Sequence, residues 1–531
     1  MAAQALLIGI DVGTSGVKVV LADLDGRTIA QSTRTYGVSQ PQPLFAEQDP
    51  EIWWDQTCRA LQDVFAKSGA NPSIVRGIGL TGQMHSLVLL DRDGAVIRPA
   101  ILWSDQRTQE QCDWIHSELG LEKTIDLVAN PALTNFTATK LIWVRQHEPE
   151  NYRRIHRVLL PKDYIRYRLT GEFASDVSDA SGTLLLDVAY RKWSEEMCER
   201  LSIPLAWLPS VHESVEVTGR VHAKAAAATG LAEGTPVAAG AGDQAAGAIG
   251  NGIVRPGIVS STIGTSGVVF AYADGIVRDP KGRLHTFCHA VPGAWHVMGV
   301  TQAAGGSLQW YRNEFAQMEQ STAEWIGRDV YELLSDEAAA VAPGSEGLVF
   351  LPYLMGERTP HLNPLARGVF FGITSRHRRA HFVRSIMEGV AFSLRDCLEL
   401  ITSLGLPVEQ IRVSGGGARS QVWRSIQGRL RAGCLYGGGQ RGPCLRCCTV
   451  GRCRQWLFRG SCLCVRCSHS RASERSAGRN TRARLCEDVR FVSRTVHISG
   501  TAFCRAYMMR EGCQARARVR PFGAAPACNG R

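Results

Sequence analysis

The pentapeptide GTSGV occurs twice in this chain, at residues 13–17 and 264–268, and apolar runs flank both copies on either side. An apolar run, a glycine-containing turn and a second apolar run together predict a β-hairpin. The flanking strands predicted in this way are 5–12, 17–24, 259–263 and 268–273. Because the strand context recurs together with the turn, the sequence predicts a duplicated domain and not a short solenoid repeat.

The length of 531 residues exceeds what one hydrophobic core usually supports, so two or more domains are expected. Strand patterns alternate with helical ones in both halves of the chain, which predicts an α/β fold. We place the first domain at residues 1–252, the second at 253–427, and a C-terminal segment of different character at 428–531.

The segment 428–531, called the tail below, holds 21 Arg, no Lys and only four acidic residues, a net charge of +17. The whole chain carries +11, so the rest is mildly acidic and we expect no nucleic-acid partner. The tail also holds 12 of the 17 cysteines and shows no sustained apolar period. We interpret it as aberrant and not natively folded, because a GC-rich gene translated in a shifted frame would give abundant Arg, Cys and Gly.

A zinc or nucleic-acid module is the alternative interpretation of the tail. Its cysteines are dense, but their spacing fits no paired CxxC frame. The cysteines concerned are Cys444, Cys447, Cys448, Cys453, Cys462, Cys464 and Cys467.

No apolar run reaches membrane-spanning length without charged residues, and the N-terminal residues lack a basic leader. We therefore expect a cytoplasmic protein with no membrane partner.

The first GTSGV turn can bind phosphate, because successive backbone N–H groups in a tight turn form a concavity for anions. The residues concerned are Gly13, Thr14 and Ser15. Asp11, at the end of the preceding strand, could hold Mg²⁺ through water, and Lys18 adds a positive charge nearby. An ordinary glycine hairpin with a solvated aspartate is the alternative.

The second turn offers Gly264 and Thr265 but lacks the acid and the lysine, since Thr262 and Val269 stand at the corresponding positions. We therefore expect unequal roles for the two turns. A glycine triplet at 415–417 follows a predicted strand at 410–414 and permits close approach of a nucleotide, although a plain loop is the simpler interpretation.

Asp243 lies among small residues between a predicted strand at 235–241 and a predicted helix at 243–250. A carboxylate there could accept the proton of a hydroxyl that attacks phosphorus. The alternative is a helix N-cap. Trp103 and Asp105 offer an aromatic face and polar groups suited to a sugar, and Met84 and His85 could line the same pocket, although a lone histidine is more often structural.

Together these motifs resemble the FGGY family of carbohydrate kinases, and they run in order from residue 8 to about residue 427. The combination of GQMH with LWSDQR is similar to family members that act on D-xylulose. The motifs that carry the resemblance are IGIDVGTSGVKVV, EQDPEIWW, GQMHSLVLLD, ILWSDQRT, LLPKDYIRYRLTGEFASDVSDASGT, AGAGDQAAGAIGNGIV, STIGTSGV, FLPYLMGERTPHLNP, MEGVAFSLRD and SGGGARSQVWRSIQ.

The resemblance implies two actin-like, RNase H-like lobes with a cleft between them, hinged near residue 252. It implies the reaction ATP + D-xylulose → ADP + D-xylulose 5-phosphate, with Mg²⁺ as cofactor, and a homodimer is possible. Asp243 would be the general base, and Asp11 would organise Mg²⁺. The residues implied to face the sugar are Met84, His85, Trp103, Asp105, Asp243 and Gln244, and those implied to face ATP are Gly13, Thr14, Ser15, Lys18, Gly264, Thr265, Gly415, Gly416 and Gly417.

Two departures from the family pattern bear on function. Gln244 stands where asparagine is common, which could alter a hydrogen bond to the sugar. The tail replaces the elements that would complete the adenine pocket. The alternatives are therefore a kinase for ribulose, gluconate or glycerol, and a kinase remnant that binds sugar without turnover.

Overall fold

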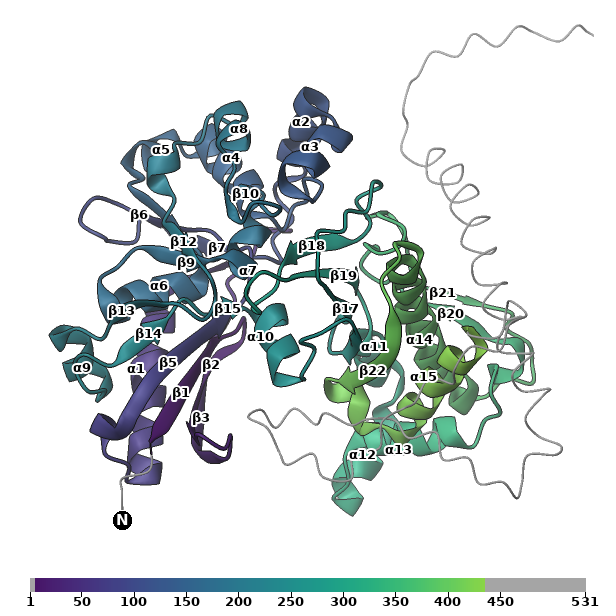
Figure 1. Cartoon of the computed structure of the whole chain (residues 1–531). Helices are drawn as coiled ribbons and strands as arrows, with labels where there is room; N and C mark the ends of the chain where they lie inside the picture. Colours follow the sequence, from purple (N-terminus) through teal and green to yellow (C-terminus); the bar gives the residue numbers. More distant parts are fainter. Residues whose placement is uncertain (1–4, 435–531) are drawn as a thin grey trace, which may run out of the picture.

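The structure is a computed structural model that describes residues 5–434. Its two lobes each contain one large mixed sheet with helices packed against it, and the short helix α10 (Asp243–Gly250) leads from one lobe to the other (Figure 1). Apart from the backbone of its first residues, the tail lies outside the described part, and so does its proposed zinc module.

The first lobe is built on a seven-stranded sheet of order β13-β14-β5-β1-β2-β3, with β15 pairing to β5. Strands β1 and β2 form the predicted antiparallel hairpin around the first turn, and β1 runs parallel to β5. The strand bounds are β1 Leu6–Val12, β2 Gly16–Asp23, β3 Thr28–Thr35, β5 Val75–Gly82, β13 Val217–Arg220, β14 Pro236–Ala238 and β15 Ala241–Gly242.

The second lobe repeats this plan in a five-stranded sheet of order β18-β19-β17-β16-β22. Here β16 and β17 form the antiparallel hairpin around the second turn, and β16 runs parallel to β22 as β1 does to β5. The predicted duplication is therefore confirmed by the pairing of the strands. The bounds are β16 Gly257–Ile263, β17 Gly267–Ala273, β18 His285–Cys288, β19 Trp295–Thr301 and β22 Val408–Ser414.

Helices cover both sheets because their apolar faces pack on the strands. Helix α1 begins after Asp49, whose side chain accepts a hydrogen bond from Glu51 N, and ends at Gly69 in the left-handed conformation. The main helices of the first lobe are α1 Pro50–Ser68, α2 Gln109–Leu119, α3 Leu121–Val128, α4 Thr137–His147, α6 Pro161–Thr170 and α9 Ala223–Thr229. Those of the second lobe are α11 Gly305–Phe315, α12 Gln317–Ile326, α13 Val330–Ala339, α14 Arg379–Ser403 and α15 Gln421–Cys434.

One strand predicted from the sequence is wrong in its extent. The run 235–241 is divided into β14 and β15 by Gly240, which has a φ of 80°. A Cβ atom at this position would lie 2.2 Å from the carbonyl oxygen of Leu80, so only glycine lets the chain pass so close to β5. The break redirects β15 so that it ends beside β5 at the start of α10.

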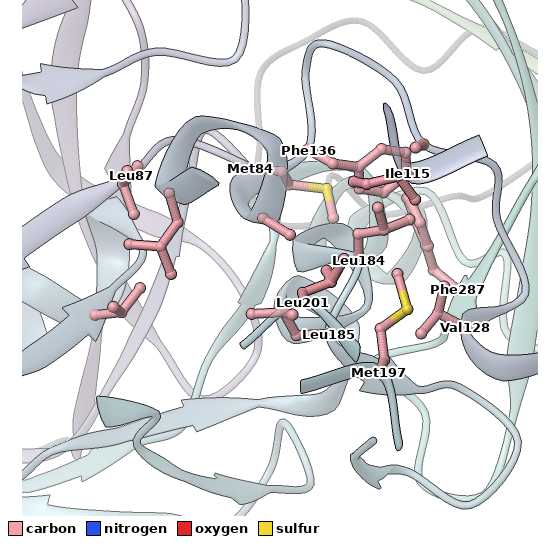
Figure 2. Packing of buried hydrophobic residues seen from close by; sticks show 14 of the residues in the cluster. Met84, Leu87, Ile115, Val128, Phe136, Leu184, Leu185, Met197, Leu201 and Phe287 are labelled. Carbon is pink, nitrogen blue, oxygen red and sulfur yellow. The ribbon is translucent and has the colours of Figure 1, made fainter. Parts of the chain in front are cut away.

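The lobes are joined by buried contacts between β18 and the first lobe. Asn130 donates from Nδ2 to Thr286 O at 2.8 Å and accepts from Thr286 N at 3.1 Å. One apolar cluster also crosses the junction, with Met84 and Phe136 from the first lobe and Phe287 from β18 (Figure 2). Within residues 5–434, no helix is long and apolar enough to span a bilayer.

Candidate active site

Three parallel strands of the first lobe end at the same level. Asp11 of β1 and Ala241 of β15 both pair with Thr81 of β5, so the three residues form one row across the sheet. The next row contains Gly82 and Gly242. The first GTSGV turn and Asp243 follow directly in the chain, which brings them together at the carboxyl ends of these strands.

Asp243 is the first residue of α10, and its side chain keeps contact with solvent. The surrounding protein nevertheless displaces water from the carboxyl group, and this loss of solvation raises the pKa of Asp243 to about 7. The nearby negative charge of Asp11 contributes to the rise. Gln244 opposes it with hydrogen bonds from its backbone and its side chain. A carboxyl group that titrates near neutral pH suits a general base.

Asp11 is partly buried, and this burial raises its pKa. Lys18, directly opposite on β2, lowers the pKa of Asp11 through its positive charge. The two carboxyl groups of Asp11 and Asp243 thus share a region of negative charge. Mg²⁺ prefers oxygen ligands, usually one or two carboxylates together with water, so these residues fit the ion.

Met84 lies between two glycines that leave room for it. A Cβ atom on Gly242 would be 2.9 Å from Met84 Sδ, and a Cβ atom on Gly182 would be 3.4 Å from Met84 Cε. Because Gly242 precedes Asp243, the thioether packs directly against the backbone that carries the candidate base. Figure 2 shows Met84 among the residues of the apolar cluster, between Leu87 and Phe136, and the cluster also contains Phe287 of the second lobe.

His85 has a φ of 67°, a conformation that non-glycine residues rarely adopt and that often marks functional sites. Its carbonyl oxygen accepts hydrogen bonds from Thr137 Oγ1 at 3.0 Å and from Lys140 Nζ at 3.1 Å. Nδ1 lies 2.7 Å from Gly182 O, and since a carbonyl oxygen can only accept, Nδ1 carries the proton. Burial lowers the pKa of His85 well below its usual value, so the ring is neutral and its Nε2 can accept a hydrogen bond from a hydroxyl group.

Trp103 connects the predicted sugar residues to the first phosphate turn. Its indole N–H donates to Thr14 Oγ1 at 2.9 Å, and Thr14 Oγ1 donates to Gln83 Oε1 at 3.4 Å. Gln48 donates from Nε2 to Thr14 O at 2.7 Å. These bonds fix the conformation of the turn and engage the hydroxyl of Thr14 within the protein.

Asp105 departs from its predicted contact with the sugar. The side chain is fully buried, and its oxygens accept hydrogen bonds from Ala46 N at 2.6 Å and from the backbone and guanidinium of Arg107. The Arg107 Nη2–Asp105 Oδ2 distance is 2.7 Å. Because these partners occupy both oxygens, the carboxylate supports the loop after Trp103 and is not available to a substrate in this structure.

The second turn packs against the beginning of α11. The carbonyl oxygen of Gly264 accepts from Gly305 N at 2.8 Å, and that of Thr265 accepts from Ala304 N at 2.9 Å and Gly306 N at 3.0 Å. The positive end of the α11 dipole therefore lies beside the turn, which favours negatively charged phosphate.

The glycine triplet adjoins the same turn. Gly415 has a φ of 81°, and a Cβ atom on it would lie 2.4 Å from Ile263 O, at the end of β16. Ser414 and Thr262 share a hydrogen bond of 2.7 Å between their hydroxyl groups across β22 and β16. The structure thus brings together both glycine motifs that the sequence predicts for ATP.

Other residues of the site carried no sequence signal. Three glycines leave room for close contacts with partners more than 35 positions away in the chain, namely Gly182, Gly305 and Gly306. No local sequence pattern reports such contacts. Among the described residues, no group of three or more His, Cys, Asp and Glu side chains could hold a metal ion, so a Mg²⁺ site here would depend on few carboxylates and on the nucleotide.

Two models of protein-family domains match this chain, one in each lobe. Residues 6–250 match the N-terminal domain of the FGGY family of carbohydrate kinases, and residues 259–430 match its C-terminal domain. The chain is 42% identical to a xylulose kinase of Escherichia coli strain K12 over 442 residues, which are 83% of this chain and 88% of the relative. It is 30% identical to a gluconokinase of Bacillus subtilis strain 168 over 448 residues, 84% of this chain and 86% of the relative.

Solved structures agree with the sequence relatives. A xylulose kinase from Rhodospirillum rubrum superposes with a TM-score of 0.73 at 34% identity, covering 80% of this chain and 84% of that one. A kinase of the same kind from Brucella ovis gives a TM-score of 0.73 at 36% identity with equal coverage. The predicted α/β fold with two actin-like lobes is confirmed, and the chain belongs to the FGGY family of carbohydrate kinases.

Proposed function

We propose that this chain is a xylulokinase, which transfers the terminal phosphoryl group of ATP to the 5-hydroxyl group of D-xylulose and so serves xylose catabolism. The relatives of 41–42% identity named xylulose kinase support this substrate over gluconate, whose kinase is 30% identical. The single observation that carries the proposal is the position of Asp243, whose pKa of about 7 suits a base beside Asp11 and the first phosphate turn.

The proposed reaction combines removal of a proton from the sugar hydroxyl with transfer of the γ-phosphoryl group. The Asp243 carboxylate accepts the proton of the sugar hydroxyl, and the oxygen forms a bond to the γ-phosphorus while the bond to the β-phosphate oxygen breaks and ADP leaves. Met84 supplies an apolar surface and His85 Nε2 an acceptor for another sugar hydroxyl. Mg²⁺, when bound near Asp11, would neutralise charge on the phosphates.

A coupled assay of ADP release tests the substrate and the reaction. D-Xylulose should give the highest kcat/KM among D-xylulose, L-ribulose, glycerol and gluconate. A clear preference for glycerol or gluconate would refute the sugar assignment. Asp243→Ala should lower turnover by roughly 10²–10⁴-fold with little change in ATP affinity, and near-normal turnover would exclude Asp243 as the base.

A second candidate function is binding of the sugar without turnover. The observation in its favour is a difference between the two sheets. Strand β5 pairs with β14 and β15 as well as with β1, whereas its counterpart β22 in the second lobe pairs only with β16 among residues 5–434. An incomplete second lobe would weaken the adenine side of the site while leaving the sugar side unaltered.

Calorimetry on the full chain separates these two functions. Binding of D-xylulose without binding of ATP or ADP would support the second candidate. Binding of both ligands together with ADP release would exclude it.

A further inference from the structure

A cluster of buried charged side chains lies beneath the carboxyl ends of β1, β5 and β15. Lys162 Nζ is 2.6 Å from Asp163 Oδ1, 2.8 Å from Asp176 Oδ1 and 3.5 Å from Asp179 Oδ2. Arg166 Nη2 lies 3.6 Å from Asp163 Oδ1, and all five side chains are fully buried. We call these five residues the buried ion cluster. The phosphoryl transfer proposed above does not use them.

The buried ion cluster contacts the strands that carry the site. A Cβ atom on Gly82, at the end of β5, would be 3.5 Å from Lys162 Cβ. Ser178 Oγ accepts a hydrogen bond of 3.1 Å from the backbone N–H of Gly242 and donates to Asp176 Oδ2 at 2.5 Å. A continuous chain of contacts therefore leads from Lys162 through Asp176 and Ser178 to Gly242, the residue before Asp243.

This contact matters because the backbone around Asp243 has few other restraints. Strand β15 contains only two residues, and both of its pairings are with β5. Gly242 is the N-cap of α10 and has no side chain to accept a hydrogen bond from the first turn. The N–H of Gly242 is the last backbone donor before the candidate base, so its direction influences where the Asp243 carboxylate points.

The Ser178 hydroxyl, which accepts this hydrogen bond from Gly242 N, is itself held firmly because it donates to a well-anchored carboxylate oxygen of Asp176. Asp176 Oδ2 accepts from Ser178 Oγ, from Ser178 N at 2.8 Å and from Ser214 Oγ at 2.9 Å. Lys162 balances the charge of Asp176 from the other side at 2.8 Å. Neither oxygen of Asp179 has a hydrogen-bond partner, and burial raises its pKa well above the usual value with a contribution from Asp243.

We propose that Ser178 is a positioning residue, which fixes the Gly242 amide and thereby orients the Asp243 carboxylate toward the sugar hydroxyl, while the buried ion cluster holds Ser178 in place. The proposal rests on the proposed function, because orientation matters only if Asp243 takes the proton. Misplacement of a reacting group by about 1 Å can cost on the order of 100-fold in rate.

Kinetics of two serine variants test the role. Ser178→Ala removes the hydroxyl that contacts Gly242, and kcat should fall about 10-fold while KM for D-xylulose and for ATP changes less than about twofold. Ser175→Ala is the matched control, because Ser175 is equally buried and donates to Asp163 Oδ2 at 2.6 Å without contacting Gly242. It should lower the thermal midpoint about as much as Ser178→Ala does and leave kcat unchanged. Equal losses of kcat in both variants would overturn the proposal.

Amide hydrogen exchange provides a readout independent of activity. In the wild-type protein the Gly242 N–H should exchange slowly, and Ser178→Ala should accelerate its exchange at least about 10-fold relative to Ser175→Ala. A Gly242 amide that exchanges freely in the wild type would overturn the proposal even if the variant does not fold. Slow exchange in a chain without turnover on any sugar would instead refute the proposed function alone.

Discussion

At the scale of single residues, the protonation of Asp243 should control the pH dependence of the reaction. The carboxyl group must be ionised to accept a proton, and its pKa lies at about 7. We therefore expect kcat/KM for D-xylulose to rise about tenfold per pH unit below pH 7 and to level off above it. Initial rates between about pH 5.5 and 9, with the coupling enzymes in excess, measure this profile.

The same profile can contradict the role of Asp243. A midpoint near pH 4, the value of an ordinary aspartate, would mean that the surroundings of Asp243 do not act on the reacting carboxylate. Asp243→Asn serves as the control, since its residual activity should lose the rise around pH 7.

His85 gives a second prediction at this scale. A Cβ atom on Gly182 would lie 2.5 Å from Nδ1 of the His85 ring, too close for the ring to stay in place. Gly182→Ala should therefore raise KM for D-xylulose about tenfold or more and change KM for ATP little. Gly79→Ala is the control, because its Cβ atom would meet no atom within 4 Å. Unchanged sugar kinetics in Gly182→Ala would remove His85 from the sugar site.

The sequence predicts candidate residues whose pattern is local, but it does not report residues that act through packing. Asp11 and Asp243 were predicted because an acid next to a glycine turn or a helix start is visible in a short stretch. Ser178 and Gly182 act on partners 64 and 97 positions away, so only the folded chain reveals them. Asp105 illustrates the opposite error, since its motif suggests a sugar ligand while Arg107 and Ala46 N occupy its oxygens.

At the scale of elements, the second phosphate turn depends on the start of α11. A Cβ atom on Gly305 would lie 2.4 Å from Gly264 O, a backbone atom that can move only if the whole turn moves. We expect Gly305→Ala to raise KM for ATP at least about tenfold and to leave the affinity for D-xylulose, measured by calorimetry, unchanged.

Gly275→Ala is the matched control for this prediction. It lies in the same lobe, and a Cβ atom there would meet no atom within 4 Å. A loss of sugar affinity in Gly305→Ala would show that the substitution disturbs more than the nucleotide side. Sequence patterns located the GTSGV turn itself, whereas the helix that supports it begins about 40 residues later and was not connected with it.

At the scale of the whole molecule, the chain has two sheets of similar topology, and we propose different tasks for them. The first ends in two carboxylates and the residues predicted to contact the sugar, and the second in glycine-rich loops predicted to contact ATP. Such a division requires that the lobes keep a defined relation to each other. The hairpin in each sheet was predicted from the repeated turn, but the contacts between β18 and the first lobe could not be derived from periodicity, because they join residues more than 100 positions apart.

A substitution of Asn130 tests whether buried hydrogen bonds between the lobes hold them together. Its fully buried amide pairs with both backbone groups of Thr286, so Asn130→Ala would leave a buried N–H and a buried C=O without their partner. We expect a loss of about 2–4 kcal/mol in the free energy of unfolding, and unfolding that separates into two calorimetric transitions. Asn251→Ala is the control, because the Asn251 side chain donates to Gly247 O, in the helix α10 that Asn251 caps, and not to the other lobe. If both variants lower the thermal midpoint equally, or if neither does, the Asn130–Thr286 pair does not hold the lobes together.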